Sequence, residues 1–201
     1  ETSMVIFSSA ISENNEEKQE AVRKKISLMS YAQALGFFMK DKKNICIAGS
    51  HGKTTTTGMA AEVFIDAGED PTVIIGTNQK KWNNTNYRGG ESNFSILEAC
   101  EHQKAFLNIQ PWIVILTNVD LDHLDYYADK KAYDQAFEEF VKKIPADGAV
   151  IYHKDDESSR KIAEKAGCMK IAADKNEKFD LKIRGEHNQK NASLVLALGK
   201  F

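Results

Sequence analysis

The sequence has no apolar stretch that approaches the roughly 20 residues required for a membrane-spanning helix, so we expect no membrane insertion. The formal net charge is only −2, so no overall positive field favours nucleic acid or anionic lipid. There is no internal repeat and no low-complexity tract. With 42% hydrophobic and 28% charged residues, the composition is typical of an ordinary globular protein, and we expect its partners to be small molecules.

Cysteine is scarce, and the three cysteines, Cys46, Cys100 and Cys168, are far apart in the chain. An odd number at such spacing argues against a disulfide framework, and no pair has the spacing of metal ligands. We therefore interpret all three as packing residues and expect the protein to work in a reducing cytoplasm.

The chain is long enough, at 201 residues, to bury one complete α/β domain and part of another. A polar break at residues 41–43, Asp-Lys-Lys, predicts a boundary between a first unit at residues 1–42 and a second at residues 43–201. Because the sequence does not begin with methionine and ends at Phe201 within a helical pattern, we expect it to be a fragment of a longer protein.

Short apolar runs alternate with stretches of helical spacing along most of the chain. We predict strands at residues 5–7, 45–48, 72–75, 95–97, 112–116 and 148–152, and helices at residues 15–25, 30–40, 54–67, 130–143 and 158–166. This alternation is typical of a doubly wound, mostly parallel sheet flanked by helices. In such folds ligands bind beyond the carboxyl ends of the strands.

A glycine-containing loop, Gly-Ser-His-Gly-Lys-Thr at residues 49–54, lies between the predicted strand 45–48 and the helix that follows. Glycines allow the backbone to approach phosphate oxygens, and the helix N-terminus adds its positive dipole end. Lys53 can then reach the terminal phosphates of ATP, and the Thr54 hydroxyl can bind Mg²⁺. The loop is shorter than the usual P-loop, because Ile47 stands where the first glycine belongs. A chance glycine turn is the alternative, and the strand–loop–helix context argues against it.

Acidic residues and a histidine follow two of the predicted strands. Glu98 and Glu101 come after the strand at residues 95–97, and Asp120, Asp122 and His123 come after the strand at residues 112–116. Both groups are therefore expected at the edge of the sheet that carries the glycine loop. Magnesium prefers oxygen ligands such as these carboxylates. For each carboxylate taken alone, a solvated or helix-capping role is equally open. The residues by themselves thus predict an α/β domain that uses ATP and Mg²⁺.

Three ordered segments resemble the Mur ligases of peptidoglycan synthesis, namely residues 48–57, 117–127 and 185–192. Residues 8–11, Ser-Ser-Ala-Ile, also resemble the end of the family's UDP-sugar domain. The resemblance covers nearly the whole chain. It implies a P-loop-containing central ATPase domain at residues 43–201 and a remnant of an N-terminal Rossmann-like domain at residues 1–42. It also implies that the C-terminal amino-acid-binding domain is absent, and that the protein is cytoplasmic in a bacterium.

The resemblance implies roles for individual residues. Lys53 would contact the β- and γ-phosphates, Thr54 the first Mg²⁺ and His123 the second, with Glu98 a further ligand. The adenine would lie against three residues of the last segment, and Asn118 would line the site between ATP and the sugar carboxylate. The expected catalytic residues are Lys53, Glu98 and His123, and the expected metal ligands are Thr54, Glu98 and His123. The expected ATP-binding residues are Gly49, Ser50, His51, Gly52, Lys53, Thr54, Thr55, Asn118, His187, Asn188 and Asn191.

One position departs from the family pattern. The family usually has Glu-Ala-Asp-Glu where this chain has Glu-Ala-Cys-Glu at residues 98–101, so Cys100 replaces a carboxylate beside the metal ligands. A thiol at this position cannot supply the carboxylate oxygen that the family pattern has there.

Within the family, the resemblance is strongest to the member that joins L-alanine to the carboxylate of UDP-N-acetylmuramate through an acyl phosphate. The segment Asp-His-Leu-Asp-Tyr-Tyr at residues 122–127 favours this member over the related ligase that adds a recycled tripeptide to the same sugar nucleotide. A folate polyglutamate ligase fits less well, because the chain opens on a sugar-nucleotide-domain motif. A non-catalytic ATP-binding fragment is the alternative from another class of protein.

Overall fold

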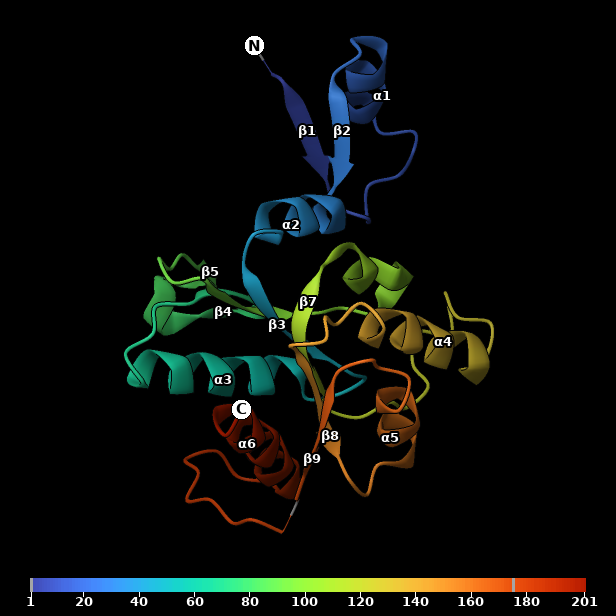
Figure 1. Ribbon diagram of the computed structural model, residues 1–201. Helices are drawn as coiled ribbons and strands as arrows, with labels where there is room; N and C mark the ends of the chain where they lie inside the picture. The colour runs from blue at the N-terminus through green and yellow to red at the C-terminus, as the bar shows by residue number, and fades with distance from the viewer. Residues whose placement is uncertain (1, 175) are drawn as a thin grey trace.

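The computed structural model describes residues 2–174 and 176–201, which form a small N-terminal unit attached to a larger α/β unit (Figure 1). The small unit contains the parallel strands β1 (Met4–Phe7) and β2 (Ser27–Ser30), with helix α1 (Glu16–Arg23) between them. Helix α2 (Tyr31–Met39) follows and leads into the first strand of the large sheet. The polar break at residues 41–43 falls at this junction, and the division into two domains there remains a prediction.

The larger unit is built on a seven-stranded sheet in the order β5-β4-β6-β3-β7-β8-β9. Its strands are β3 (Lys43–Ala48), β4 (Thr72–Gln79), β5 (Thr85–Arg88), β6 (Phe94–Glu98), β7 (Pro111–Leu116), β8 (Ala149–His153) and β9 (Met169–Ala173). Every pairing is parallel except that of the edge strand β5 with β4. The predicted doubly wound, mostly parallel sheet is confirmed.

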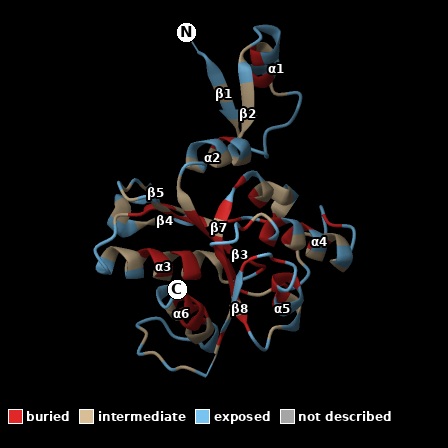
Figure 2. Cartoon of the chain, viewed as in Figure 1, coloured by how far each residue is buried: buried red, intermediate tan, exposed pale blue. Residues whose placement is uncertain are grey.

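Helices cover both faces of this sheet. Helices α3 (Lys53–Asp66) and α6 (Glu186–Gly199) pack together on one face (Figure 1). The other face carries α4 (Lys130–Val141), α5 (Glu157–Ala163) and a short 3₁₀ segment, His102–Asn108. A second 3₁₀ turn, Lys80–Trp82, joins β4 to β5. Figure 2 shows the consequence, because the central strands and the inward faces of these helices are the buried parts of the chain.

Local sequence signals account for these elements. The central strands β3 and β7 are almost continuous apolar runs, as strands covered on both faces must be. Helix α4 buries Tyr133, Phe137 and Phe140 on a single face. Ser30 caps α2, since its side chain accepts a hydrogen bond from Gln33 N while the Gln33 side chain accepts one from Ser30 N.

The structure adds three strands that the sequence did not predict, β2, β5 and β9. Each is short, lies at an edge of its sheet and carries mostly exposed or half-buried side chains, so none shows a strong apolar pattern. The interpretation of the cysteines also needs a correction. Cys46 and Cys168 are buried, as packing residues should be, but Cys100 is exposed because it lies in the loop beyond β6. Among the described residues, no helix has both the length and the apolarity of a bilayer-spanning segment.

Candidate active site at the carboxyl edge of the sheet

The glycine loop connects β3 to α3 and requires glycine at two positions. Gly49 has a φ of 136°, and a Cβ added there would lie 2.2 Å from Thr117 Oγ1. Gly52, at the N-cap of α3, has a φ of 84°, and its Cβ would lie 2.9 Å from Asn191 Oδ1. Both positions combine a backbone conformation that favours glycine with contacts that leave no room for a side chain.

The segment that follows β7 holds this loop in place. Ser50 N donates to the Asn118 carbonyl oxygen at 3.0 Å. The Asn118 side chain accepts a hydrogen bond from His51 N at 3.0 Å and donates one to His51 O at 2.8 Å. Asp120 N donates to Ser50 Oγ at 2.9 Å. The predicted residues Ser50, His51 and Asn118 are therefore brought together, with His51 exposed to solvent.

The N-terminus of α3 opens into a hollow of about 380 Å³. It is lined by residues 50–55 and by Glu98. No side chain caps this helix end, and the first backbone N–H groups of a helix have no partner within the helix. These donors and the positive end of the helix dipole can hold an anion such as a phosphate group. The hollow thus contains Gly52, Lys53, Thr54 and Thr55 of the predicted set.

Lys53 is already paired with a carboxylate. Its Nζ lies 3.0 Å from both carboxylate oxygens of Glu101, and it also donates to the carbonyl oxygen of Gly49. The Glu101 side chain is completely buried. Tyr133 OH donates to Glu101 Oε1 at 3.4 Å and lies 2.9 Å from Ser50 Oγ. Burial is the main cause that raises the pKa of Tyr133, so the phenol stays protonated at neutral pH.

The sequence places Glu101 at the same edge as Glu98, as a possible oxygen ligand, but assigns it no role in the site. Its position three residues after Glu98 was a signal, but nothing in the residue pattern indicates that its carboxylate is buried against Lys53. The structure therefore adds Glu101 and Tyr133 to the candidate site.

The candidate metal ligands fall into two groups. Thr54 Oγ1 donates to Glu98 Oε1 at 3.0 Å, while Glu98 Oε2 accepts a hydrogen bond from Gly76 N at 2.6 Å. A hydroxyl and a carboxylate oxygen this close suit a hard cation such as Mg²⁺.

His123 belongs to a second group, with Glu101 and Asp122. Its Nε2 is 3.4 Å from Glu101 Oε1, and its possible ligand atom lies within 4.8 Å of those of Glu101 and Asp122. It also forms a cluster of the same kind with His102 and Asp125. The expected metal ligands therefore belong to two groups, Thr54 with Glu98, and His123 with Glu101 and Asp122.

A second hollow, of about 360 Å³, adjoins the first, because His51 lines both. Its walls are His51, Thr117, Asn118, Asp120, His153, Asp155, Asp156, His187, Lys190 and Asn191. The predicted residues His187 and Asn191 thus lie beside the loop. Asn188 does not line this hollow, since its Nδ2 donates to the Arg184 carbonyl oxygen at 2.7 Å at the start of α6.

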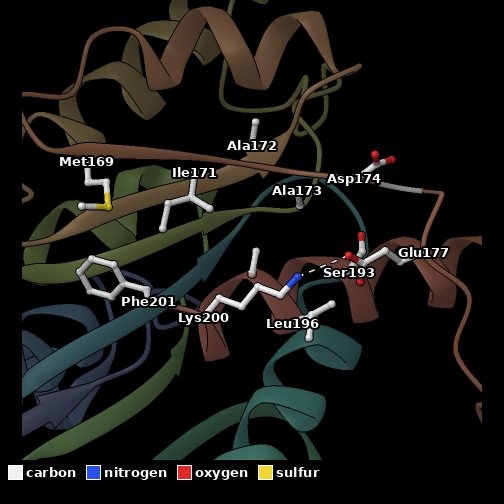
Figure 3. A pocket seen from close by; sticks show the side chains of 11 residues that line it. Met169, Ile171, Ala172, Ala173, Asp174, Glu177, Ser193, Leu196, Lys200 and Phe201 are labelled. Carbon is white, nitrogen blue, oxygen red and sulfur yellow. Dashed lines mark hydrogen bonds and ion pairs between the residues drawn. The ribbon is translucent and has the colours of Figure 1, made fainter.

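A separate pocket of about 510 Å³ lies between β9 and α6, away from these residues. Figure 3 shows its apolar walls, which include Met169, Ile171 and Phe201, and the ion pair between Lys200 and Glu177 at its rim. This ion pair is solvent-exposed, and such pairs contribute little to binding or stability. None of the predicted site residues lines this pocket.

The chain matches the family model for the Mur ligase middle domain over residues 47–178. The chain belongs to the Mur ligase family. Over 169 residues it is 43% identical to UDP-N-acetylmuramate–L-alanine ligase of Clostridium botulinum strain Langeland, covering 84% of this chain and 37% of that protein. The ligase of the same name from Clostridium tetani is 38% identical over 169 residues, with the same shares covered. The chain thus spans little more than a third of the length of these relatives.

Solved Mur ligase structures share the fold of the whole chain. A ligase from Neisseria meningitides that joins UDP-N-acetylmuramate to L-alanyl-γ-D-glutamyl-meso-diaminopimelate superimposes with a TM-score of 0.85, at 21% identity, over 98% of this chain and 74% of that one. UDP-N-acetylmuramate–alanine ligase of Thermotoga maritima gives 0.83, at 24% identity, over 98% of this chain and 51% of that one. Both superpositions include the N-terminal unit, so its arrangement beside the large sheet is also shared.

Proposed function

We propose that this chain is the ATP-binding part of a ligase that joins L-alanine to the carboxylate of UDP-N-acetylmuramate. The observation that carries the proposal is the arrangement of Lys53 and Thr54 at the N-terminus of α3, with Glu98 and Glu101 beside them. This arrangement lies within the region that matches the Mur ligase middle domain. The choice of L-alanine rests on the 43% identity to relatives that carry the alanine-ligase name.

The two adjoining hollows divide the proposed nucleotide site. The triphosphate would lie on the backbone N–H groups of residues 49–55, where Lys53 would contact the β- and γ-phosphates. The nucleoside would extend past His51 toward His187 and Asn191, as the continuity of the hollows supports. Thr54 and Glu98 would hold Mg²⁺, which would offset the negative charge of the phosphates.

The proposed chemistry begins when the muramyl carboxylate attacks the γ-phosphorus of ATP. The carboxylate oxygen bonds to phosphorus as the bond to the β-phosphate oxygen breaks, giving an acyl phosphate and ADP. Lys53 and the N–H groups of the loop would stabilise the charge on the transferred phosphoryl group. The alanine amine then attacks the acyl carbon, and inorganic phosphate leaves as the amide forms.

Nucleotide binding tests the ATP site directly. Titration calorimetry of the 201-residue chain with ATP and Mg²⁺ should show binding. Lys53→Ala should weaken it by at least about tenfold, because a charge-assisted phosphate contact is lost. Lys165→Ala, which changes an exposed lysine distant from the loop in sequence, is the matched control. Equal ATP affinity in the two variants would refute the loop assignment.

A chimera tests whether this chain supports the ligation of L-alanine to UDP-N-acetylmuramate. The matching segment of the Clostridium botulinum ligase would be replaced by this chain, and product formation would be followed by mass spectrometry. We expect UDP-N-acetylmuramyl-L-alanine from ATP, UDP-N-acetylmuramate and L-alanine, and no product when Lys53→Ala is introduced. A folded, ATP-binding chimera that forms no alanyl product would contradict the proposal.

A further inference from the structure

His153 is a buried histidine that lacks a well-formed hydrogen bond in a polar pocket. It is the last residue of β8, only 7% of its surface is exposed, and it lines the hollow that adjoins the glycine loop. Within residues 2–174 and 176–201, neither its Nδ1 nor its Nε2 has a partner with good hydrogen-bond geometry, although the backbone of Lys190 interacts with the ring at a less favourable geometry. Buried polar atoms in folded proteins are nearly always paired, so ring nitrogens without a well-formed hydrogen bond at a pocket wall are available to a ligand that enters the pocket.

The surroundings of His153 determine which hydrogen bonds it can form. Asp155 and Asp156 face the pocket from the loop after β8, Lys190 and His187 from α6, and His51 from the glycine loop. Burial, as the largest influence, lowers the pKa of His153, and the nearby Asp156 opposes this only in part. The ring is therefore neutral at pH 7 and offers one N–H donor and one acceptor nitrogen.

The location of His153 indicates which part of a ligand it can reach. The glycine loop and the first turn of α3 supply the donors for phosphate, and His51 is the residue common to that hollow and this one. A nucleotide with its phosphates on the loop can therefore extend its sugar and base into the hollow that His153 lines. A neutral ring that both donates and accepts suits a nucleoside, whose base and ribose hydroxyls carry donors and acceptors.

We propose that His153 recognises the nucleotide by a hydrogen bond to its nucleoside part. This inference rests on the proposed ATP site and extends it to a residue outside the glycine loop and α6. The assignment makes β8 a third source of nucleotide contacts, beside the loop after β3 and the N-terminal part of α6. His153 would contribute affinity for the nucleoside and none for the phosphates.

Two ligands separate these contributions, namely ATP and inorganic tripolyphosphate, each titrated into the 201-residue chain at constant Mg²⁺. His153→Leu replaces the ring with an apolar side chain of moderate size and so removes both hydrogen-bonding atoms. We expect it to weaken ATP binding by about tenfold, while tripolyphosphate binding changes by less than about twofold. His153→Gln, which restores a donor and an acceptor, should recover part of the ATP affinity. Circular dichroism and the melting temperature show whether each variant is folded.

The outcomes distinguish this inference from the proposed function. If the unaltered chain binds neither ATP nor tripolyphosphate, the ATP site itself is wrong and the inference fails with it. If the chain binds both, but folded His153→Leu binds ATP as tightly, only the inference is overturned. If His153→Leu weakens the binding of ATP and of tripolyphosphate equally, the inference is also overturned, because the residue would then act through the loop. Should His153→Leu not fold, the same outcome in His153→Gln overturns the inference.

Discussion

Lys53 Nζ lies 3.0 Å from both carboxylate oxygens of Glu101, a residue whose side chain is completely buried. The lysine of the glycine loop therefore has a protein counterion where a phosphate would bind. Lys53 comes from the start of α3 and Glu101 from the loop after β6, so the pair also ties the loop to the neighbouring strand. A bound phosphate must share Lys53 with Glu101 or displace it.

Glu101→Gln tests the structural part of this relationship. The substitution keeps the shape of the side chain but leaves Lys53 without its counterion, and we expect a loss of about 1–3 kcal/mol in the free energy of unfolding. Urea denaturation followed by circular dichroism measures this loss. Glu69→Gln, at an exposed position, is the matched control and should change the unfolding midpoint little. Equal midpoints in both variants would show that the pair does not stabilise the fold.

Tyr133→Phe tests the contact between α4 and the glycine loop. Tyr133 OH lies 2.9 Å from Ser50 Oγ and 3.4 Å from Glu101 Oε1, and the ring is completely buried. Removal of the hydroxyl should cost about 1 kcal/mol of unfolding free energy, because Ser50 loses a buried partner but keeps its hydrogen bond from Asp120 N. Tyr126→Phe, at a partly exposed ring, is the control. The prediction fails if the two variants unfold at the same urea concentration.

The sequence predicts the central part of the fold well, because burial on both faces leaves a direct apolar signal. Strands β3 and β7 and the helix after residue 53 are found in this way. The edge strand β5, Thr-Asn-Tyr-Arg, carries no such signal, since its stability comes from pairing with β4 rather than from burial of its side chains.

The candidate site is predicted unevenly for the same reason. The glycine loop is local in sequence, so residues 49–54 identify it directly. Glu101 and His153 depend on burial by distant elements, and a single carboxylate or histidine in a sequence is more often solvated. The resemblance supplied Asn188, but here its side chain donates a hydrogen bond to the Arg184 carbonyl oxygen, just before α6, rather than lining the hollow. The glycine loop is found because it is local, whereas the positions of Glu101, His153 and Asn188 depend on long-range packing that no local pattern encodes.

The buried state of His153 predicts a pH dependence of stability. Its pKa in the folded protein lies below the usual value of 6.5, mainly because burial disfavours the charged ring. Below about pH 6.5 the unfolded chain therefore binds a proton that the folded chain does not, and the free energy of unfolding falls as the pH falls. Above about pH 6.5 the ring is neutral in both states, so its full contribution to the free energy of unfolding is present.

The melting temperature, measured between pH 7.5 and pH 5.5, tests the sign of this effect. This interval spans about one pH unit on each side of an unperturbed histidine pKa. His153→Gln should show a smaller decrease than the unaltered chain, because the titrating group is gone. His187→Gln, which removes an exposed histidine, is the matched control. A decrease that is identical in all three proteins would assign the pH dependence to other groups.

Gly49 and Gly68 provide a comparison that separates backbone strain from steric clash. Both have positive φ, 136° and 85°, but a Cβ on Gly68 meets nothing within 4 Å, whereas one on Gly49 would lie 2.2 Å from Thr117 Oγ1 and 2.6 Å from Asn118 O. Gly68→Ala should therefore cost about 1 kcal/mol, the expense of left-handed backbone alone. Gly49→Ala should cost about 3 kcal/mol or more, because the loop must move away from the segment after β7.

Urea denaturation gives both values, and calorimetry with ATP should show binding retained in Gly68→Ala and lost in Gly49→Ala. Equal unfolding free energies in the two variants would mean that the loop can shift freely, and that its position against Asn118 is not what determines its geometry.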